Sequence, residues 1–135
     1  MARNTRTGSS RGFTIIELMV VLALVVILAS LAMVQYRRSI VYAKEAVLRD
    51  DLTKMREAID QYYADKNQYP PTLSALASEG YLREIPKDPI TESNSSWQEV
   101  PAEPDGANPT SAPGVFSVKS GSDGTALDGS RYSDW

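Results

Sequence analysis

The side chains that could do chemistry in this chain are carboxylates and hydroxyls, because its 135 residues include no His and no Cys. The usual proton-transfer group at neutral pH and the imidazole and thiolate metal ligands are therefore missing. A Ser-His-Asp site, a thiol nucleophile, a zinc-thiolate site and a disulfide framework are excluded. Neither S-x-x-K nor the phosphate-binding G-x-x-x-x-G-K-[ST] occurs. The net charge of −3 argues against a dedicated nucleic-acid binder, and we expect no enzymatic activity.

One carboxylate has an unusual position, at the head of the longest apolar run. Glu17 directly precedes Leu18–Val34, where Ser30 is the only residue that is not apolar. A lone charge costs about 2.5–3.5 kcal/mol at the centre of a bilayer and less near its surface. Glu17 therefore needs either headgroup water or a positively charged partner.

The element that must position Glu17 is a membrane-length helix. A helix from Phe13 to Tyr36 would span roughly 36 Å, enough for a bilayer core of about 30 Å. The basic residues before it predict a cytoplasmic N-terminus, although Arg37 and Arg38 weaken the bias. A plain signal anchor is an alternative; a cleaved secretory signal is disfavoured, because the run is long and the helical pattern continues beyond it. The leader contains three basic residues: Arg3, Arg6 and Arg11.

The helix is predicted to continue well past the apolar run, because no Gly or Pro occurs between Phe13 and Pro70. A single helix of over 50 residues, about 80 Å long, follows. Charged pairs with the spacing Glu45/Arg49 and Asp50/Lys54 suit its exposed face. The apolar face, on which a small domain should pack, is formed by residues three and four apart: Tyr36, Ile40, Ala43, Val47, Leu48, Leu52, Met55, Ile59 and Tyr62.

The remaining chain predicts a small α+β domain. Pro70-Pro71 is expected to end the long helix, and a short helix over Leu73–Glu79 follows, capped by Thr72 and closed by Gly80. Residues 97–100 and 115–119 are candidate strands of a two- or three-stranded antiparallel sheet, separated by a proline-rich loop over 101–113. The last segment, 120–135, is rich in Gly, Ser and Asp.

The stretch Arg11-Gly12-Phe13-Thr14-Ile15-Ile16-Glu17-Leu18 resembles the N-terminus of type IV pilins and of the pseudopilins of type II secretion systems. The resemblance implies that a prepilin peptidase cuts between Gly12 and Phe13, and that the new Phe13 amine is methylated. It also implies that Glu17 of one subunit pairs with the Phe13 ammonium of its neighbour and sets the register of a fibre. Leaving either charge unpaired in hydrocarbon is costly.

Within this superfamily the chain is most similar to the major pseudopilins of type II secretion systems. The likeness lies in Tyr69-Pro70, Leu73–Leu76, and Gly80-Tyr81-Leu82 leading to Ile85-Pro86-Lys87-Asp88-Pro89, and in the absence of the Cys pair of many true pilins. The implied fold is a type IV pilin-like α+β fold, with one long N-terminal helix packed by a small antiparallel sheet and a C-terminal loop. The implied organisation is a cleaved leader (1–12), a transmembrane assembly helix (13–36) and a periplasmic domain (37–135), whose parts are an amphipathic helix half (37–69) and a short helix with the sheet (70–135).

The function that the resemblance implies is structural. The chain would form a homopolymer, a short periplasmic fibre that drives folded proteins through an outer-membrane secretin. Its implied partners are minor pseudopilins, the prepilin peptidase, the inner-membrane assembly platform with its ATPase, the secretin and membrane lipid. Two alternatives stay open: a type IV pilin or minor pilin for motility, adhesion or DNA uptake, and a membrane-anchored periplasmic domain of unrelated function.

The sequence departs from this family at two places. Val26 and Val34 stand where relatives usually have a Gly and a Pro, so this helix should be harder to unwind. The family also carries a calcium site in its C-terminal loop, built from Asp side chains and carbonyl oxygens. The candidate ligands here are Asp123, Asp128, Ser130 and Asp134, but the loop is short and Arg131 lies near an expected acidic position. A calcium site and a solvated Asp/Gly turn both stay open.

Overall fold

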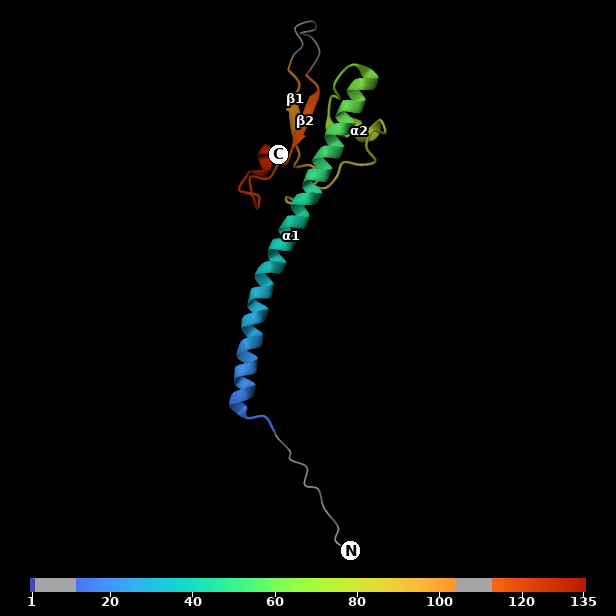
Figure 1. Cartoon of the computed structure of the whole chain (residues 1–135). Coiled ribbons are helices and arrows are strands. Elements are labelled where there is room, and N and C mark those ends of the chain that lie inside the picture. Colours follow the sequence, from blue (N-terminus) through green and yellow to red (C-terminus); the bar gives the residue numbers. More distant parts are fainter. Residues whose placement is uncertain (2–11, 104–112) are drawn as a thin grey trace. The chain divides into compact units, whose positions relative to one another are not determined.

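The computed structural model describes residue 1, residues 12–103 and residues 113–135. Its elements are α1 (Ile15–Lys66), α2 (Leu73–Ser78), β1 (Gln98–Pro101), β2 (Val115–Lys119) and the short 3₁₀ helix η1 (Tyr132–Asp134), traced in Figure 1. One long helix and a two-stranded antiparallel sheet confirm the predicted α+β, pilin-like fold. The basic leader residues Arg3, Arg6 and Arg11, and most of the predicted loop, lie outside the described residues.

The chain divides into two compact units, residues 1–38 and residues 39–135. The helix α1 runs through both as 52 residues without a Gly or Pro, which confirms the predicted helix of over 50 residues. It begins at Ile15, two residues after Phe13, and it ends at Lys66 rather than at Pro70. The reason for the early end is Asn67, which adopts a left-handed conformation with φ 53° and donates its N–H to the Tyr63 carbonyl at 2.7 Å. Asn tolerates this helix-terminating position better than most residues.

The apolar face of α1 is buried only in the second unit. Leu48, Leu52, Met55, Ile59 and Tyr62 are buried as predicted, and Ala58 joins them. The prediction was wrong for Tyr36, Ile40, Ala43 and Val47, which are exposed. Glu45 is the first residue along α1 that the rest of the unit buries. The apolar face predicted from residues three and four apart therefore extended too far toward the N-terminus.

The short helix α2 has the ends that the sequence predicts. The Thr72 side chain accepts the Ala75 N–H at 3.3 Å at the start of the helix. At the other end Gly80 has φ +84°, and the Tyr81 N–H donates to the Leu76 carbonyl at 2.9 Å. This pattern closes a helix with a left-handed glycine. The last helical residue is Ser78, one before the predicted Glu79.

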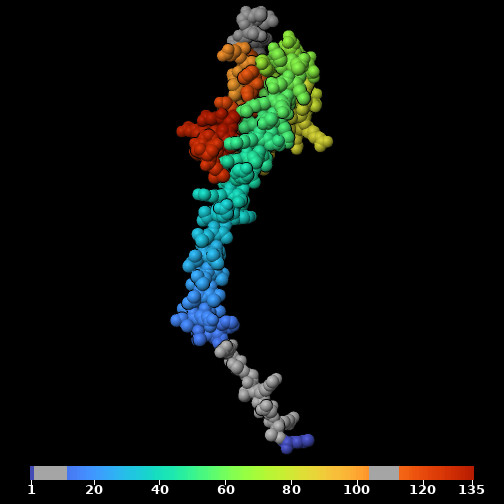
Figure 2. All heavy atoms as spheres, in the orientation of Figure 1, coloured from blue at the N-terminus to red at the C-terminus, as the bar shows by residue number. Residues whose placement is uncertain are grey.

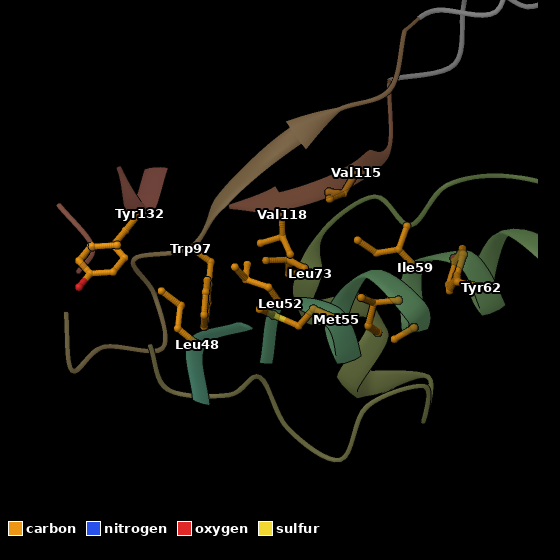
Figure 3. Close-up of a cluster of buried hydrophobic side chains, with 13 residues drawn as sticks. Leu48, Leu52, Met55, Ile59, Tyr62, Leu73, Trp97, Val115, Val118 and Tyr132 are labelled. Carbon is orange, nitrogen blue, oxygen red and sulfur yellow. The ribbon is translucent and has the colours of Figure 1, made fainter. Parts of the chain in front are cut away.

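The sheet pairs β1 with β2, with Gln98 opposite Lys119 and a register shift at Val100/Pro101. The strands lie within one residue of their predicted positions. On β2, Val115 and Val118 are buried, and Figure 3 shows them facing the apolar side chains of α1. Trp97 fills the same cluster just before β1, and its Nε1–H donates to the Pro86 carbonyl at 2.8 Å. Burying each large apolar side chain contributes about 1.5–3 kcal/mol, so this cluster is the main stabilising contact of the unit.

Candidate functional site

The predicted processing site lies in a short non-helical segment before α1. Gly12, Phe13 and Thr14 are all exposed and outside regular secondary structure. Phe13 is 86% exposed, and among the described residues other than Gly12 and its chain neighbours no heavy atom lies within 4 Å of where a Cβ on Gly12 would be. The Gly12–Phe13 peptide bond is therefore exposed and free of helical hydrogen bonds, so a peptidase can reach it without first unwinding α1.

Glu17 lies in the first turn of α1, three residues after Thr14, which directly precedes the helix. Its backbone N–H donates to Thr14 Oγ1 at 3.2 Å, and the Leu18 N–H donates to the Thr14 carbonyl at 3.1 Å. Thr14 is thus the N-cap, and T-x-x-E is the sequence pattern of a capping box. A carboxylate in this turn is also favoured by the positive end of the helix dipole. Glu17 lines a shallow, largely apolar groove together with Phe13, Thr14, Ile15, Leu18 and Val21.

The helix behind Glu17 presents an apolar surface on every side. Among the described residues, α1 is the one helix long and apolar enough to cross a membrane, and none of its most apolar 18-residue stretch is buried. Its large side chains from Leu18 to Val34 are between 49% and 66% exposed. The one polar side chain, Ser30, donates its hydroxyl to the Val26 carbonyl at 2.7 Å, so its polar group is satisfied within the helix.

Two of the four candidate calcium ligands, Asp128 and Ser130, contact each other, but the three acidic candidates do not come together. The carboxylate of Asp128 is already engaged: Oδ1 accepts from the Ser130 N–H and hydroxyl at 2.9 and 2.6 Å, and Oδ2 lies 3.3 Å from the Arg49 guanidinium. These Ser130 hydrogen bonds, with the Arg49 charge, hold the pKa of Asp128 below its usual value. Asp123 and Asp134 are exposed. Within the described residues no three acidic side chains come together in a metal-binding group.

A buried carboxylate that spacing did not identify joins α1 to the C-terminal segment. Glu45 is only 7% exposed, and its Oε1 accepts from the Leu127 N–H at 2.8 Å and the Tyr132 hydroxyl at 2.9 Å. The predicted pair Glu45/Arg49 is therefore wrong, because Arg49 faces Asp128 instead, whereas Asp50/Lys54 forms at 2.6 Å as predicted. Burial and the hydrogen bond to Glu45 raise the pKa of Tyr132 to about 12. The signal in the sequence was that Glu45 lies three residues before Leu48, on the apolar face.

A second buried carboxylate, Asp88, organises the segment before the sheet. It is fully buried, and its Oδ1 accepts from the Ile90 and Thr91 N–H groups at 2.8 and 3.2 Å. Its Oδ2 accepts the Ser120 hydroxyl at 2.7 Å, which ties this turn to the end of β2. An Asp followed by Pro is a turn signal, but the distant Ser120 partner has no local signature.

Comparison with known proteins supplies the remaining information on this site. Residues 8–33 match the family model described as the prokaryotic N-terminal methylation motif, which covers Gly12, Phe13 and Glu17. The type II secretion system core protein G of Escherichia coli (strain K12) is 32% identical over 99 residues, which cover 62% of this chain and 68% of that protein. The chain belongs to the type II secretion system core protein G family.

Other members of the core protein G family match to a similar extent. The protein of Klebsiella michiganensis is 33% identical over 62% of this chain and 70% of its own length, and that of Pseudomonas aeruginosa is 33% identical over 58% and 66%. No solved structure matches the chain. The resemblance to pseudopilins is thereby confirmed, and the core protein G relatives are named for a part of a secretion system rather than for a catalytic activity.

Proposed function

We propose that this chain is a structural subunit that polymerises into a periplasmic pseudopilus and drives protein export by type II secretion. The observation that carries the proposal is the combination of core protein G relatives with the methylation motif on an exposed, uniformly apolar helix. An apolar surface of this kind needs lipid or other apolar helices around it. Before assembly, membrane lipid covers this surface. After assembly, the same helix of neighbouring subunits covers it.

Processing comes first in this proposal. A prepilin peptidase cuts the exposed Gly12–Phe13 bond on the cytoplasmic side of the inner membrane, and the Phe13 amine is then methylated. The chain crosses the membrane once, with a cytoplasmic N-terminus and a periplasmic domain from residue 37 onward. The accessible, non-helical geometry of Gly12 and Phe13 supports the cleavage step.

Assembly depends on Glu17. In the fibre its carboxylate meets the Phe13 ammonium of a neighbouring subunit, beside the apolar side chains that line the same groove as Glu17. Burying an unpaired charge is far less favourable than burying a hydrogen-bonded pair, so only the register that pairs both charges is stable. Minor pseudopilins, the assembly platform and its ATPase, and the secretin are the proposed partners, and the chain has no catalytic role.

The processing step is tested by mass spectrometry of the chain from cells with and without the prepilin peptidase. The expected result is a mass lower by residues 1–12 only when the peptidase is present, with one added methyl group on Phe13. Equal masses in both strains would contradict the proposal. Deleting the gene should reduce the set of secreted proteins; loss of twitching motility with intact secretion would favour a type IV pilin instead.

The assembly step is tested with Glu17→Gln, which keeps the shape of the side chain and removes its charge. The variant should be processed and inserted into the membrane but should not form fibres detectable by cross-linking or microscopy. Ser30→Ala is the matched control, because that hydroxyl is satisfied within its own helix. Fibres of normal abundance from Glu17→Gln would rule out the role of this carboxylate in registry.

A further inference from the structure

The C-terminal segment folds back on itself through its own backbone. The N–H groups of Ala126, Gly129 and Tyr132 donate to the carbonyls of Ser130, Ala126 and Gly124 at 2.7, 3.0 and 3.1 Å. Thr125 and Arg131 form an isolated antiparallel bridge at the neck of this turn. Figure 2 shows the segment, in red, lying against α1 residues of the same unit. Main-chain hydrogen bonds therefore set the shape of the segment. Its position against α1 must be fixed by other contacts.

The charge that faces Asp128 is the guanidinium of Arg49. Arg49 Nη2 lies 3.3 Å from Asp128 Oδ2, while Oδ1 is occupied by the N–H and hydroxyl of Ser130. A calcium ion needs 6–8 oxygen ligands at about 2.3–2.6 Å, and carboxylates supply most of the negative charge. A calcium ion bound by Asp128 would have to displace the cation already there and the two donors of Ser130.

The same guanidinium also contacts the last aromatic ring. The Arg49 guanidinium carbon lies 4.2 Å from the centre of the Trp135 ring, and the Trp135 Nε1–H donates to the Ser130 hydroxyl at 2.7 Å. Contacts therefore run in a closed circuit from Arg49 to Asp128, Ser130, Trp135 and back to Arg49. A planar guanidinium can form an ion pair and stack on an aromatic ring at once, which an ammonium does less well. We call these four residues the Arg49 circuit.

Beside the circuit lies the buried carboxylate of Glu45, one turn earlier on α1. It accepts hydrogen bonds from Leu127 and Tyr132, on either side of Asp128 in the sequence. The helix α1 therefore presents two charged groups to the segment. The Glu45 carboxylate meets hydrogen-bond donors, and the Arg49 guanidinium meets the Asp128 carboxylate. With Glu45 hydrogen-bonded to two donors and Asp128 paired with Arg49, both carboxylates already have partners that a metal ion would have to displace.

We propose that the Arg49 circuit replaces the calcium ion that the family resemblance implies, so that the C-terminal segment of this chain closes onto α1 without a metal. Arg49 supplies the positive charge from the helix side. The segment keeps Asp128 as the anion and uses Ser130 and Trp135 to fix its position. Asp123 and Asp134 remain solvated acidic residues.

The proposal is tested on the full chain in detergent micelles by calorimetric titration with CaCl₂ and by thermal unfolding in CaCl₂ and in EGTA. The expected result is no saturable binding at millimolar calcium and the same Tm in both solutions. Arg49→Gln should lower the Tm by about 5 °C, and Arg49→Lys should lower it by less. Arg83→Gln is the matched control, because Arg83 is exposed and its side chain forms no hydrogen bond or ion pair among the described residues.

The pairing itself is tested by Asp128→Asn alone and combined with Arg49→Gln. If the two residues act in one circuit, the Tm of the double variant should fall by less than the sum of the falls in the two single variants. Saturable calcium binding that is abolished by Asp123→Asn or Asp128→Asn, or a Tm that rises with calcium, would overturn the proposal. An Arg49→Gln variant as stable as the wild type would overturn it as well. Neither readout depends on fibre assembly, so the proposed function is tested separately.

Discussion

Glu45 and Arg49 lie one turn apart on α1 and have opposite surroundings. Glu45 is nearly buried with two hydrogen-bond donors, whereas the Arg49 and Asp128 side chains are 60% and 55% exposed. An exposed ion pair by itself contributes about 0–1 kcal/mol, because water and salt screen it. A buried carboxylate with satisfied hydrogen bonds costs far more to disturb. Glu45 is therefore the stronger anchor of the C-terminal segment, and the Arg49 circuit is the weaker one.

Replacing Glu45 by Ala should lower the free energy of unfolding by about 2–4 kcal/mol, since the Leu127 N–H and the Tyr132 hydroxyl each lose their acceptor. The measurement is denaturant unfolding of the full chain in micelles. Glu57→Ala is the matched control, because Glu57 is on the same helix and exposed. Equal effects of the two substitutions would contradict the importance of the buried carboxylate.

Tyr132 makes the stability of the second unit sensitive to alkaline pH. Its pKa is raised from the usual 10 to about 12, so the folded chain holds the phenol proton more tightly than the unfolded chain does. The resulting stabilisation is fully present below pH 10 and is lost as the pH rises through about 12. Across this pH range the Tm of the wild type should therefore fall more steeply than the Tm of Tyr132→Phe. If the two Tm values fall in parallel, this titration is ruled out.

The segment between α2 and β1 depends on side-chain hydrogen bonds rather than on regular secondary structure. Asp88 supplies acceptors for two backbone N–H groups and for the Ser120 hydroxyl. Ser120 is followed by Gly121, where a Cβ would overlap the Ser96 carbonyl oxygen. Only glycine permits so close an approach of two backbones. Asp88 and Gly121 thus fix this loop against the end of β2 from its two sides.

Asp88→Ala should lower the free energy of unfolding by about 2–4 kcal/mol, because it leaves one buried and two partly buried donors without an acceptor. Hydrogen exchange should also become faster at the Ile90 and Thr91 amides, which locates the effect in the loop. Asp60→Ala, an exposed change on α1, should stay within about 0.5 kcal/mol of the wild type. Unchanged protection at Ile90 and Thr91 would show that Asp88 does not hold the loop.

The elements that could be predicted are those with local causes. The length of α1 follows from the lack of Gly and Pro, and the ends of α2 follow from Thr72 and Gly80. The match of residues 8–33 to the N-terminal methylation motif also rests on local sequence, and Thr14 could have been identified as the cap from its spacing to Glu17. Contacts between distant residues could not be predicted. Glu45 and Tyr132 are 87 residues apart, and no pattern within either segment identifies the other.

The two units of the chain differ in whether their apolar side chains are buried. Residues 39–135 bury their own apolar cluster, whereas the apolar side chains of the first unit are exposed within the described chain. The first unit therefore needs apolar surroundings that these residues do not supply themselves. Its α1 segment is helical throughout from Ile15, with β-branched residues rather than Gly or Pro at Val26 and Val34.

This composition predicts that the first half of α1 stays helical in the assembled fibre. A Gly or Pro in a helix interior is about 1 or 3 kcal/mol less favourable than Ala, so the Gly and Pro that the resemblance to pseudopilins implies at these two places would lower the resistance to unwinding, and Val26 and Val34 do not. A filament map at side-chain resolution should show unbroken helix through residues 26–34. Val34→Pro is the matched variant, expected to unwind locally and to make these amides exchange faster. An unwound segment in the unaltered fibre would contradict the prediction, and would mean that subunit packing rather than helix propensity decides how this helix stretches.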